Sequence, residues 1–387
     1  MESPFTITVY DGQFRRRGWI GDPSSLTATV RHNALSVAEV TIPADHPRIG
    51  DVITPGARLA ITYRGEHLLS GPVVKVTGTG PTVTSTITLT VEDDWRVLAR
   101  TLAWPNPTGP ITAQGAATAY DRKSGPAETV LKHFAGRNFT RLARPVTVAP
   151  DLGRGGTINV QARMHPLSDR LYPAVDQAGI GVSVRQVGSG LVLDCYTPTV
   201  RRRVLSEDSG ALTGWEWSTT APGCTRVVVG GAGEGTAREF LHVVNADLEG
   251  EWRDVVEEFR DARDVGGDTT DSEGNTVPMP PAEAEAMLRA RGLERLTEAA
   301  PTSGLSLTLA EAAGFRYGQH VRVGDTLTVR VGPGVTVTDI LREASLTYAD
   351  GGLEVTPVVG TRTDDPDVTL RRAVNDLARA VRALRTR

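Results

Sequence analysis

The stretch GARLAITYRGEHLLSGPVVKVTGTGPTVTSTITLTV, from Gly56 to Val91, decides the fold of this chain. Apolar residues alternate with polar ones near both of its ends, at Leu59, Ile61, Tyr63, Ile87, Leu89 and Val91. Strands with one buried face show this period of two, because successive side chains point to opposite sides. Turn-forming residues at 65–66, 70–71 and 77–81 separate the alternating segments. The pattern predicts a meander of short antiparallel strands, half of a small barrel or sandwich. The stretch holds no nucleophile–base pair, metal cluster or phosphate loop, so we expect its role to be structural.

Length and composition indicate a soluble protein of several domains. The 387 residues suggest two to four domains, at roughly 100–200 residues each. A net charge of −4 does not suggest a partner that is a polyanion. The opening residues MESPFTITVYDG lack a basic region followed by an apolar core, and no apolar run approaches the ~18–20 residues of a membrane helix. We therefore expect a soluble protein made in the cytoplasm, with no segment that spans a membrane.

Cysteine and arginine usage give no sign of a disulfide framework or of a specialised anion-binding role. Cys195 and Cys224 show neither CxxC spacing nor a disulfide framework, which favours two reduced, buried thiols over a single bridge. Basic residues are nearly all arginine, since lysine occurs only at 75, 123 and 132. Arginine suits carboxylate partners geometrically, but we give more weight to a GC-rich coding bias.

Residues 1–107 are predicted to form the first β domain, a barrel. Further strands are expected at Phe5–Tyr10, Leu26–Arg31 and Ala38–Ile42, with a hairpin turn around residues 32–34. Glu92–Arg100 has the pattern of a short helix, and its acidic residues would favour the positive end of the helix dipole.

Residues 108–210 are predicted to form a small α+β insertion domain. Helices are expected at Ala127–Phe134 and Leu167–Ala178, and a hairpin at Gly181–Val187 and Gly190–Tyr196. The run Arg201–Arg203 stands alone and is followed by acidic residues, so we interpret it as a solvated loop or a salt-bridged contact with another subunit rather than a phosphate site.

Residues 211–360 are predicted to form a second β barrel with a loop and helix inserted at 264–299. A glycine leads an alternating strand at Gly324–Val331, and further strands follow, as they do after Gly56. The segment Gly230–Thr236 lacks the Gly-Lys-Ser/Thr ending of a phosphate loop, so a flexible hairpin tip is favoured.

No metal or cofactor site is predicted. Asp268, Asp271 and Glu273 lie in a low-complexity loop, but they lack the ligand spacing of a calcium loop. An exposed loop is favoured, and whether it binds an ion stays open.

Residues 361–387 are predicted to form a C-terminal helix. Apolar residues recur there at heptad spacing, at Leu370, Val374, Leu377, Val381 and Leu384. The stripe spans about two heptads, fewer than the three or four that define a coiled coil. Two interpretations remain open: a helix that packs on its own domain, or a short trimeric coiled coil.

Several short motifs together resemble the minor tail proteins, or baseplate-hub (tail tip hub) components, of long-tailed phages that infect actinobacteria. The motifs lie at 25–26, 31–33, 42–47, 55–57, 92–96, 103–107, 229–231 with Arg238, 259–264, 317–318 and 323–325. The resemblance therefore spans most of residues 1–360 and is most specific in the N-terminal third.

This resemblance implies a mainly β fold in which two barrels related to tail-tube proteins alternate with α+β insertions. It implies a homotrimeric ring at the tail tip of the virion, assembled in the host cytoplasm. The implied partners are the distal tail protein, the tail tube or tape-measure protein and the central fibre or tip proteins. DNA would pass only transiently through the lumen. The family supplies no catalytic residues, cofactor or metal.

Two other functions compete with the structural one. A tail-associated cell-wall hydrolase is disfavoured because no HExxH motif is present, the histidines are scattered and neither cysteine has a catalytic signature. A receptor- or carbohydrate-binding module is suggested by tryptophans in a β protein. These lie mostly inside predicted elements, where core packing is favoured: Trp19, Trp95, Trp104, Trp215, Trp217 and Trp252.

Overall fold

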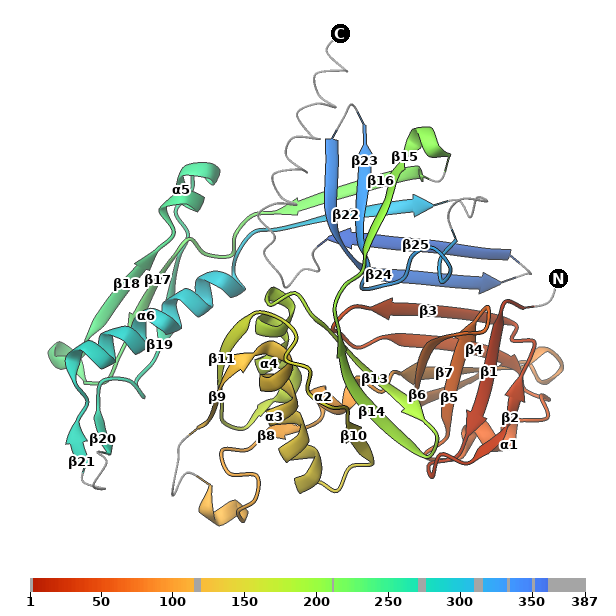
Figure 1. The fold of residues 1–387 in the computed structure, drawn as a ribbon, viewed down its shortest axis with the longest axis horizontal. Helices are drawn as coiled ribbons and strands as arrows, with labels where there is room; N and C mark the ends of the chain where they lie inside the picture. The colour runs from red at the N-terminus through yellow and green to blue at the C-terminus, as the bar shows by residue number, and fades with distance from the viewer. Residues whose placement is uncertain are drawn as a thin grey trace, which may run out of the picture. The chain divides into compact units, whose positions relative to one another are not determined.

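The chain is mainly β and divides into two compact units (Figure 1). The computed structural model describes residues 3–114, 120–210, 212–270, 276–309, 316–332, 335–349 and 352–360. Unit 1 combines Met1–Trp215 with Ser306–Val359, and unit 2 includes Glu216–Leu305. The insertion is thus wider than the 264–299 that the sequence predicts.

The N-terminal part of unit 1 is an antiparallel meander. Its strands follow the order β2-β1-β5-β6-β7-β4-β3. Their bounds are β1 (Phe5–Tyr10), β2 (Arg16–Ile20), β3 (Ser25–Arg31), β4 (Val37–Pro43), β5 (Arg58–Tyr63), β6 (Glu66–Thr79) and β7 (Thr86–Glu92), with the short helices α1 (Ile49–Ile53), η1 (Thr82–Thr84) and α2 (Arg96–Ala99). The alternation read from the sequence is confirmed, because Leu59, Ile61 and Leu89 are fully buried.

The long strand β6 changes partners halfway along its length. Glu66–Pro72 pairs with β5, and Val73–Thr79 pairs with β7. The predicted turn at Ser70-Gly71 is wrong, because both residues lie inside this strand. A Cβ atom on Gly71 would stand 1.8 Å from the carbonyl oxygen of Glu92, so only glycine fits where the strand passes the end of β7.

The remaining strands of this sheet form a second group with the same pairing order, and this group continues past the ends of unit 1 at Trp215 and Ser306. They are β15 (Val200–Ser206), β16 (Leu212–Thr220), β22 (Thr302–Leu309), β23 (Thr326–Val331), β24 (Val335–Ala349) and β25 (Gly352–Gly360), with η3 (Glu207–Ser209) after β15. We call β3-β4-β7-β6-β5-β1 repeat 1 and β16-β22-β25-β24-β23-β15 repeat 2. One difference is that β1 runs antiparallel to β5, whereas β15 runs parallel to β23.

The last three strands of the two repeats share most of their register, apart from a shift between Ile61 and Thr62 in β5 that β23 lacks. Equivalent residues differ by 268 in number, as Gly56 and Gly324 do, and both of these glycines have a positive φ. The same register shift occurs at the same place in each repeat. The equivalent cross-strand pairs are Arg58–Pro72 and Thr326–Ile340, Val73–Val91 and Leu341–Val359, and Lys75–Thr90 and Glu343–Val358. The similar alternation that follows Gly56 and Gly324 in the sequence therefore reflects a structural repeat.

Repeats 1 and 2 join through β3 and β24, which lie side by side in Figure 1. Seven residues of β3 pair antiparallel with Glu343–Ala349. The other edge of this half of β24 is taken by β25. The described strands of both repeats therefore belong to one continuous sheet, whose path runs from β16 to β2 without closing on itself.

An α+β subdomain, residues 102–196, packs within unit 1. Helices α3 (Ala127–Arg141) and α4 (Leu167–Gln177) confirm the two predicted helices, and β13 (Gly181–Val187) and β14 (Gly190–Tyr196) confirm the hairpin. Its core includes Phe134, Leu171 and Leu193. The other elements are β8 (Leu102–Ala103), η2 (Ile111–Ala113), β9 (Asp121–Pro126), β10 (Val146–Val148), β11 (Thr157–Ala162) and β12 (His165–Pro166).

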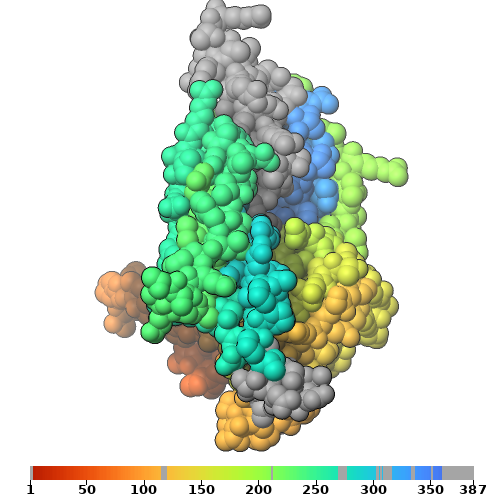
Figure 2. All heavy atoms as spheres, turned by 90° about the vertical axis from the view of Figure 1, so that its left-hand side faces the viewer, coloured from red at the N-terminus to blue at the C-terminus, as the bar shows by residue number. Residues whose placement is uncertain are grey.

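Unit 2 is a three-stranded sheet covered by one helix. Its elements are β17 (Arg226–Gly230), η4 (Gly235–Ala237), β18 (Phe240–Val244), α5 (Ala246–Trp252), β19 (Glu257–Asp261), β20 (Asp268–Thr270), β21 (Thr276–Pro278) and α6 (Pro281–Glu298). Leu288 and Leu296 of α6 pack on Val227 and Val229 of β17. In Figure 2 the residues of α6, in cyan, lie against those of the green strands. None of the described helices is both long and apolar enough to cross a membrane.

Candidate functional site

A buried polar cluster lies where repeat 1, the α+β subdomain and repeat 2 meet. We call it the polar junction, and its members are His32, Asn33, Asp176, Tyr196 and Arg342. The β3–β4 hairpin tip contributes the first two residues, α4 contributes Asp176, β14 contributes Tyr196 and β24 contributes Arg342. Three parts of unit 1 are thus tied together by side chains at one point.

Each polar group of Asn33 is matched in this junction. Its Nδ2 donates to Asp176 Oδ1 and to the carbonyl oxygen of Ile180, each at 2.9 Å. Its Oδ1 accepts from the backbone N–H of Val182 at 2.7 Å. Asn33 has φ +50°, a conformation that asparagine tolerates better than most residues, so both its backbone and its side chain suit this turn.

The charges of the junction are paired out of water. Arg342 Nη1 donates to Asp176 Oδ2, and the two side chains are 8% and 2% exposed. His32 Nδ1 lies 2.8 Å from the hydroxyl of Tyr196, while His32 Nε2 lies 3.4 Å from Asp176 Oδ1. Burial raises the pKa of the Tyr196 phenol, so it stays protonated. Such a network rigidifies the meeting point because an unpaired member would be costly to bury.

A second buried pair ties the meander to the α+β subdomain. Arg58 Nη2 donates to both carboxylate oxygens of Asp94, at 2.6 and 2.8 Å. Ser70 donates to the same carboxylate and accepts from the backbone N–H of Gln186, whose side chain accepts from Arg58. The predicted helix at 92–100 is therefore wrong at its start: the α-helix begins at Arg96, and Asp94 is an ion-pair partner rather than a cap.

A third network holds the α+β subdomain together. Glu128 is fully buried and accepts from Lys132 at 2.6 Å and from Arg154 at 2.8 Å. The Arg154 guanidinium keeps the pKa of Glu128 far below its usual range, although burial opposes this. Asp194 completes the network, 2.8 Å from Arg154.

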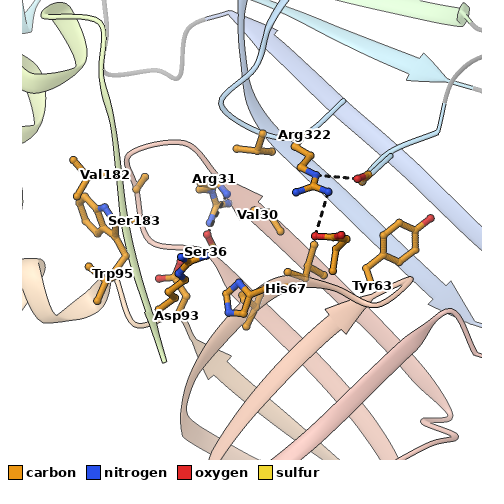
Figure 3. Close-up of a pocket in the computed structure, with 18 of the residues that line it drawn as sticks. Val30, Arg31, Ser36, Tyr63, His67, Asp93, Trp95, Val182, Ser183 and Arg322 are labelled. Carbon is orange, nitrogen blue, oxygen red and sulfur yellow. Dashed lines mark hydrogen bonds and ion pairs between the residues drawn. The ribbon is translucent and has the colours of Figure 1, made fainter. Parts of the chain in front are cut away.

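A pocket of about 220 Å³ opens beside the junction (Figure 3). Its lining comes from the same three parts of unit 1: Val30 and Tyr63 from repeat 1, Ser183 from the α+β subdomain, and Arg322 from the loop before β23. Arg322 donates to the carbonyl oxygen of Gly318 at 2.8 Å and lies 3.2 Å from a carboxylate oxygen of Glu66.

Asp93, on the wall of this pocket, is a perturbed acid. Its Oδ1 is buried and makes no hydrogen bond to the described residues. Burial raises the pKa of Asp93 to about 7, against the opposing effect of hydrogen bonding with Ser36. The carboxyl thus tends to stay protonated below neutral pH.

The described residues give no support for nucleophilic or metal chemistry. Cys195 and Cys224 are free and buried, as the sequence predicts. Burial raises the pKa of both thiols, that of Cys195 to about 12, so neither is a thiolate at neutral pH. Within the described ranges, no three His, Cys, Asp or Glu side chains are placed to hold a metal ion.

The remaining sequence predictions have mixed outcomes. The heptad residues Leu370, Val374, Leu377, Val381 and Leu384 lie outside the described residues, as do Asp271 and Glu273; Asp268 begins β20. The prediction that Arg201–Arg203 forms a loop is wrong, because these residues lie in β15. Arg201 forms an ion pair with Asp325 of the same chain, at 2.8 Å. The expectation of mostly buried tryptophans is also wrong: Trp95 is buried, Trp19 is 58% exposed and the other four are half-buried.

Comparison with known proteins agrees with this architecture. A model of the Siphovirus ReqiPepy6 Gp37-like protein family matches residues 6–361. The 43 kDa tail protein of prophage MuSo2 from Shewanella oneidensis is similar in fold, with a TM-score of 0.54 at 13% identity, covering 93% of this chain and 100% of that chain. A tail protein from Neisseria meningitidis has a TM-score of 0.52 at 10% identity, covering 93% and 97%. A search of curated proteins found no significant match.

Proposed function

Because the chain belongs to the Siphovirus ReqiPepy6 Gp37-like family of tail proteins, we propose that it is the hub of a siphophage tail tip. In this proposal it is a structural component of the virion. Three copies form a ring that joins the tail tube and distal tail protein to the central fibre or tip proteins. The tape-measure protein is a further candidate neighbour on the tube side.

The observation that supports the hub most directly is the repeat within the large sheet. Two copies of the same six-stranded pairing order lie in one chain, and they join edge to edge through β3 and β24. Three chains, each with two such repeats, would supply six similar β modules around one axis. A ring of this kind can mate with a six-fold tube although it contains only three subunits.

The predicted domains take roles in this proposal. Residues 1–107 and 211–360 would form the ring, together with β15, which completes repeat 2. Residues 108–210 would brace them, a role that the buried polar junction supports because it ties this subdomain to both repeats. Networks closed by paired charges suit a scaffold, since they fix one arrangement and present no reactive group.

The C-terminal segment would add a clamp below the ring. Leu370, Val374, Leu377, Val381 and Leu384 supply a heptad stripe, and a parallel trimer would bury it. Deleting residues 364–387 tests the clamp separately from the ring: loss of trimer stability supports it, and an unchanged trimer contradicts it.

Mass in solution and presence in the particle test the hub. The full chain is expected to form trimers by light scattering at micromolar concentration, and to be found in purified tails by mass spectrometry. A chain that stays monomeric at all concentrations and never enters a tail would overturn the proposal.

A further inference from the structure

One strand edge in repeat 1 is open where its counterpart in repeat 2 is covered. In repeat 2, the second half of β24 pairs with β25 on one side and with β3 on the other. In repeat 1, the second half of β6 pairs with β7 on one side only, among the described strands. The offset of 268 places Lys75–Thr79 where Glu343–Thr347 of β24 meets β3.

The exposure of the two halves differs accordingly. All six residues from Val74 to Thr79 are exposed, and Val74 and Val76 are 39% and 41% exposed. Their counterparts Arg342, Ala344 and Leu346 in β24 are buried. An extended strand edge with exposed valines is a ready template for another strand, so natural proteins normally cover or block such an edge.

The strand that fits this edge is identified by the repeat. In repeat 1 the strand that covers β24 is β3, and its counterpart in repeat 2 is β16, which has the same place at the end of the pairing order. Among the described strands, β16 pairs only with β22, so its outer edge is also open. The described strands of each chain therefore have two open edges. The edge of β6 is equivalent to the edge of β24 in the joint, and the edge of β16 is equivalent to that of β3.

We propose that β16 of one copy pairs with the second half of β6 of the next copy, repeating between chains the β3–β24 joint that lies within each chain. This deepens the proposed hub function and rests on it, because it names the surfaces through which the ring closes. The contact is head-to-tail, so each copy offers two different edges, and such contacts close into a ring when the rotation allows it.

Charge supports this pairing. In the joint within the chain, Arg31 Nε of β3 lies 2.6 Å from Glu343 Oε2 of β24. Position 75, the counterpart of Glu343, is a lysine, and β16 carries the exposed acid Glu216. The pairing between chains thus has opposite charges available on its two strands.

Hydrogen exchange of the full chain tests the pairing without any substitution. It is measured at protein concentrations below and above the dissociation constant of self-association. Amides in 74–79 and 213–220 are expected to exchange about tenfold or more slowly in the oligomer than in the monomer. A control region is β23, whose two edges are both covered within the chain and whose exchange should not change.

The outcomes separate the two proposals. An oligomer whose β6 and β16 amides exchange as fast as in the monomer overturns the edge pairing and leaves the hub standing. A chain that never self-associates overturns the hub and the pairing together.

Charge reversal gives a second measurement. Lys75→Glu and Glu216→Lys are each expected to weaken self-association about threefold to fivefold, because each places like charges on the two paired strands. Arg330→Glu is the matched control, an exposed strand position on β23 where the same change of sign should have no effect. Equal weakening by all three variants, or no weakening by Lys75→Glu and Glu216→Lys, would contradict the pairing.

Discussion

Removing the carboxylate of the polar junction should unfold unit 1 at markedly lower denaturant concentration. Asp176→Ala leaves the Arg342 guanidinium charged, 8% exposed and without its carboxylate, and it deprives Asn33 of one acceptor. Breaking a buried ion pair by removing one partner costs about 3–5 kcal/mol. Solvent screening reduces this little, because Asp176 itself is only 2% exposed.

The measurement is urea unfolding of the full chain, with hydrogen exchange of β24 to assign the transition to unit 1. With an m-value of about 3 kcal/mol/M, the midpoint should fall by about 1–1.7 M. Asp169→Ala is the control: this aspartate is exposed in the first turn of the same helix, and its loss should cost less than about 1 kcal/mol.

The double variant Asp176→Ala/Arg342→Met isolates the reason for the loss. It removes both charges and keeps an apolar side chain of similar length, so most of the lost stability should return. If Asp176→Ala costs less than its control, or if the second substitution returns nothing, the junction is not held by charge pairing and our reasoning is wrong.

Smaller changes probe other parts of unit 1. Gly71→Ala should lower the free energy of unfolding by about 3 kcal/mol, because the added Cβ meets the backbone of β7, while Gly78→Ala in the same strand should cost about 1 kcal/mol or less; equal costs in urea unfolding would refute the close approach. The pKa of Asp93 rises on folding from 3.8 to about 7, so the folded state holds a proton that the unfolded chain has lost. Stability should therefore fall as pH rises from about 4 to about 7, by up to about 1.4 kcal/mol per pH unit, and Asp93→Asn should remove this slope in unfolding experiments across that range. Cys195 and Cys224 should react with a thiol reagent at pH 8 about a hundredfold more slowly in the native chain than in urea, and fast native labelling would contradict their burial.

Strands with regular alternation could be located from the sequence alone. The predicted limits of β1 and β14 match the structure, because each has a strict pattern of one buried face. Strands without that pattern could not be predicted from the sequence. In β15 the run Arg201–Arg203 masks a strand whose arginines point outward or pair within the chain.

The polar junction could be predicted only in part. The turn at His32 and Asn33 is visible as the tip of a hairpin, but the partners of Asn33 lie 143 and 149 residues away. Pairings at such separations depend on the folded arrangement and leave no local pattern. The same holds for Asp94, which resembles a helix cap locally and is instead paired with Arg58, 36 residues earlier.

The similarity between the two alternating stretches is visible in the sequence, but it does not by itself predict a repeat. The alternation after Gly56 and after Gly324 is similar in pattern only, since few residues are identical. Cross-strand register preserves the relation better than residue identity does, because many side chains satisfy the same alternation of buried and exposed positions.

The two hairpins at equivalent places in the repeats have connections of very different length. In repeat 1 the connection from β3 to β4 is a short turn whose side chains are sealed in the polar junction, so lengthening it would pull Asn33 away from its partners. In repeat 2 the connection from β16 to β22 accommodates all the described elements of unit 2. The β3–β4 turn is held by its side-chain contacts, whereas the β16–β22 connection accommodates a large insertion. A foreign domain grafted for display on this scaffold should therefore be tolerated in the second connection and rejected in the first.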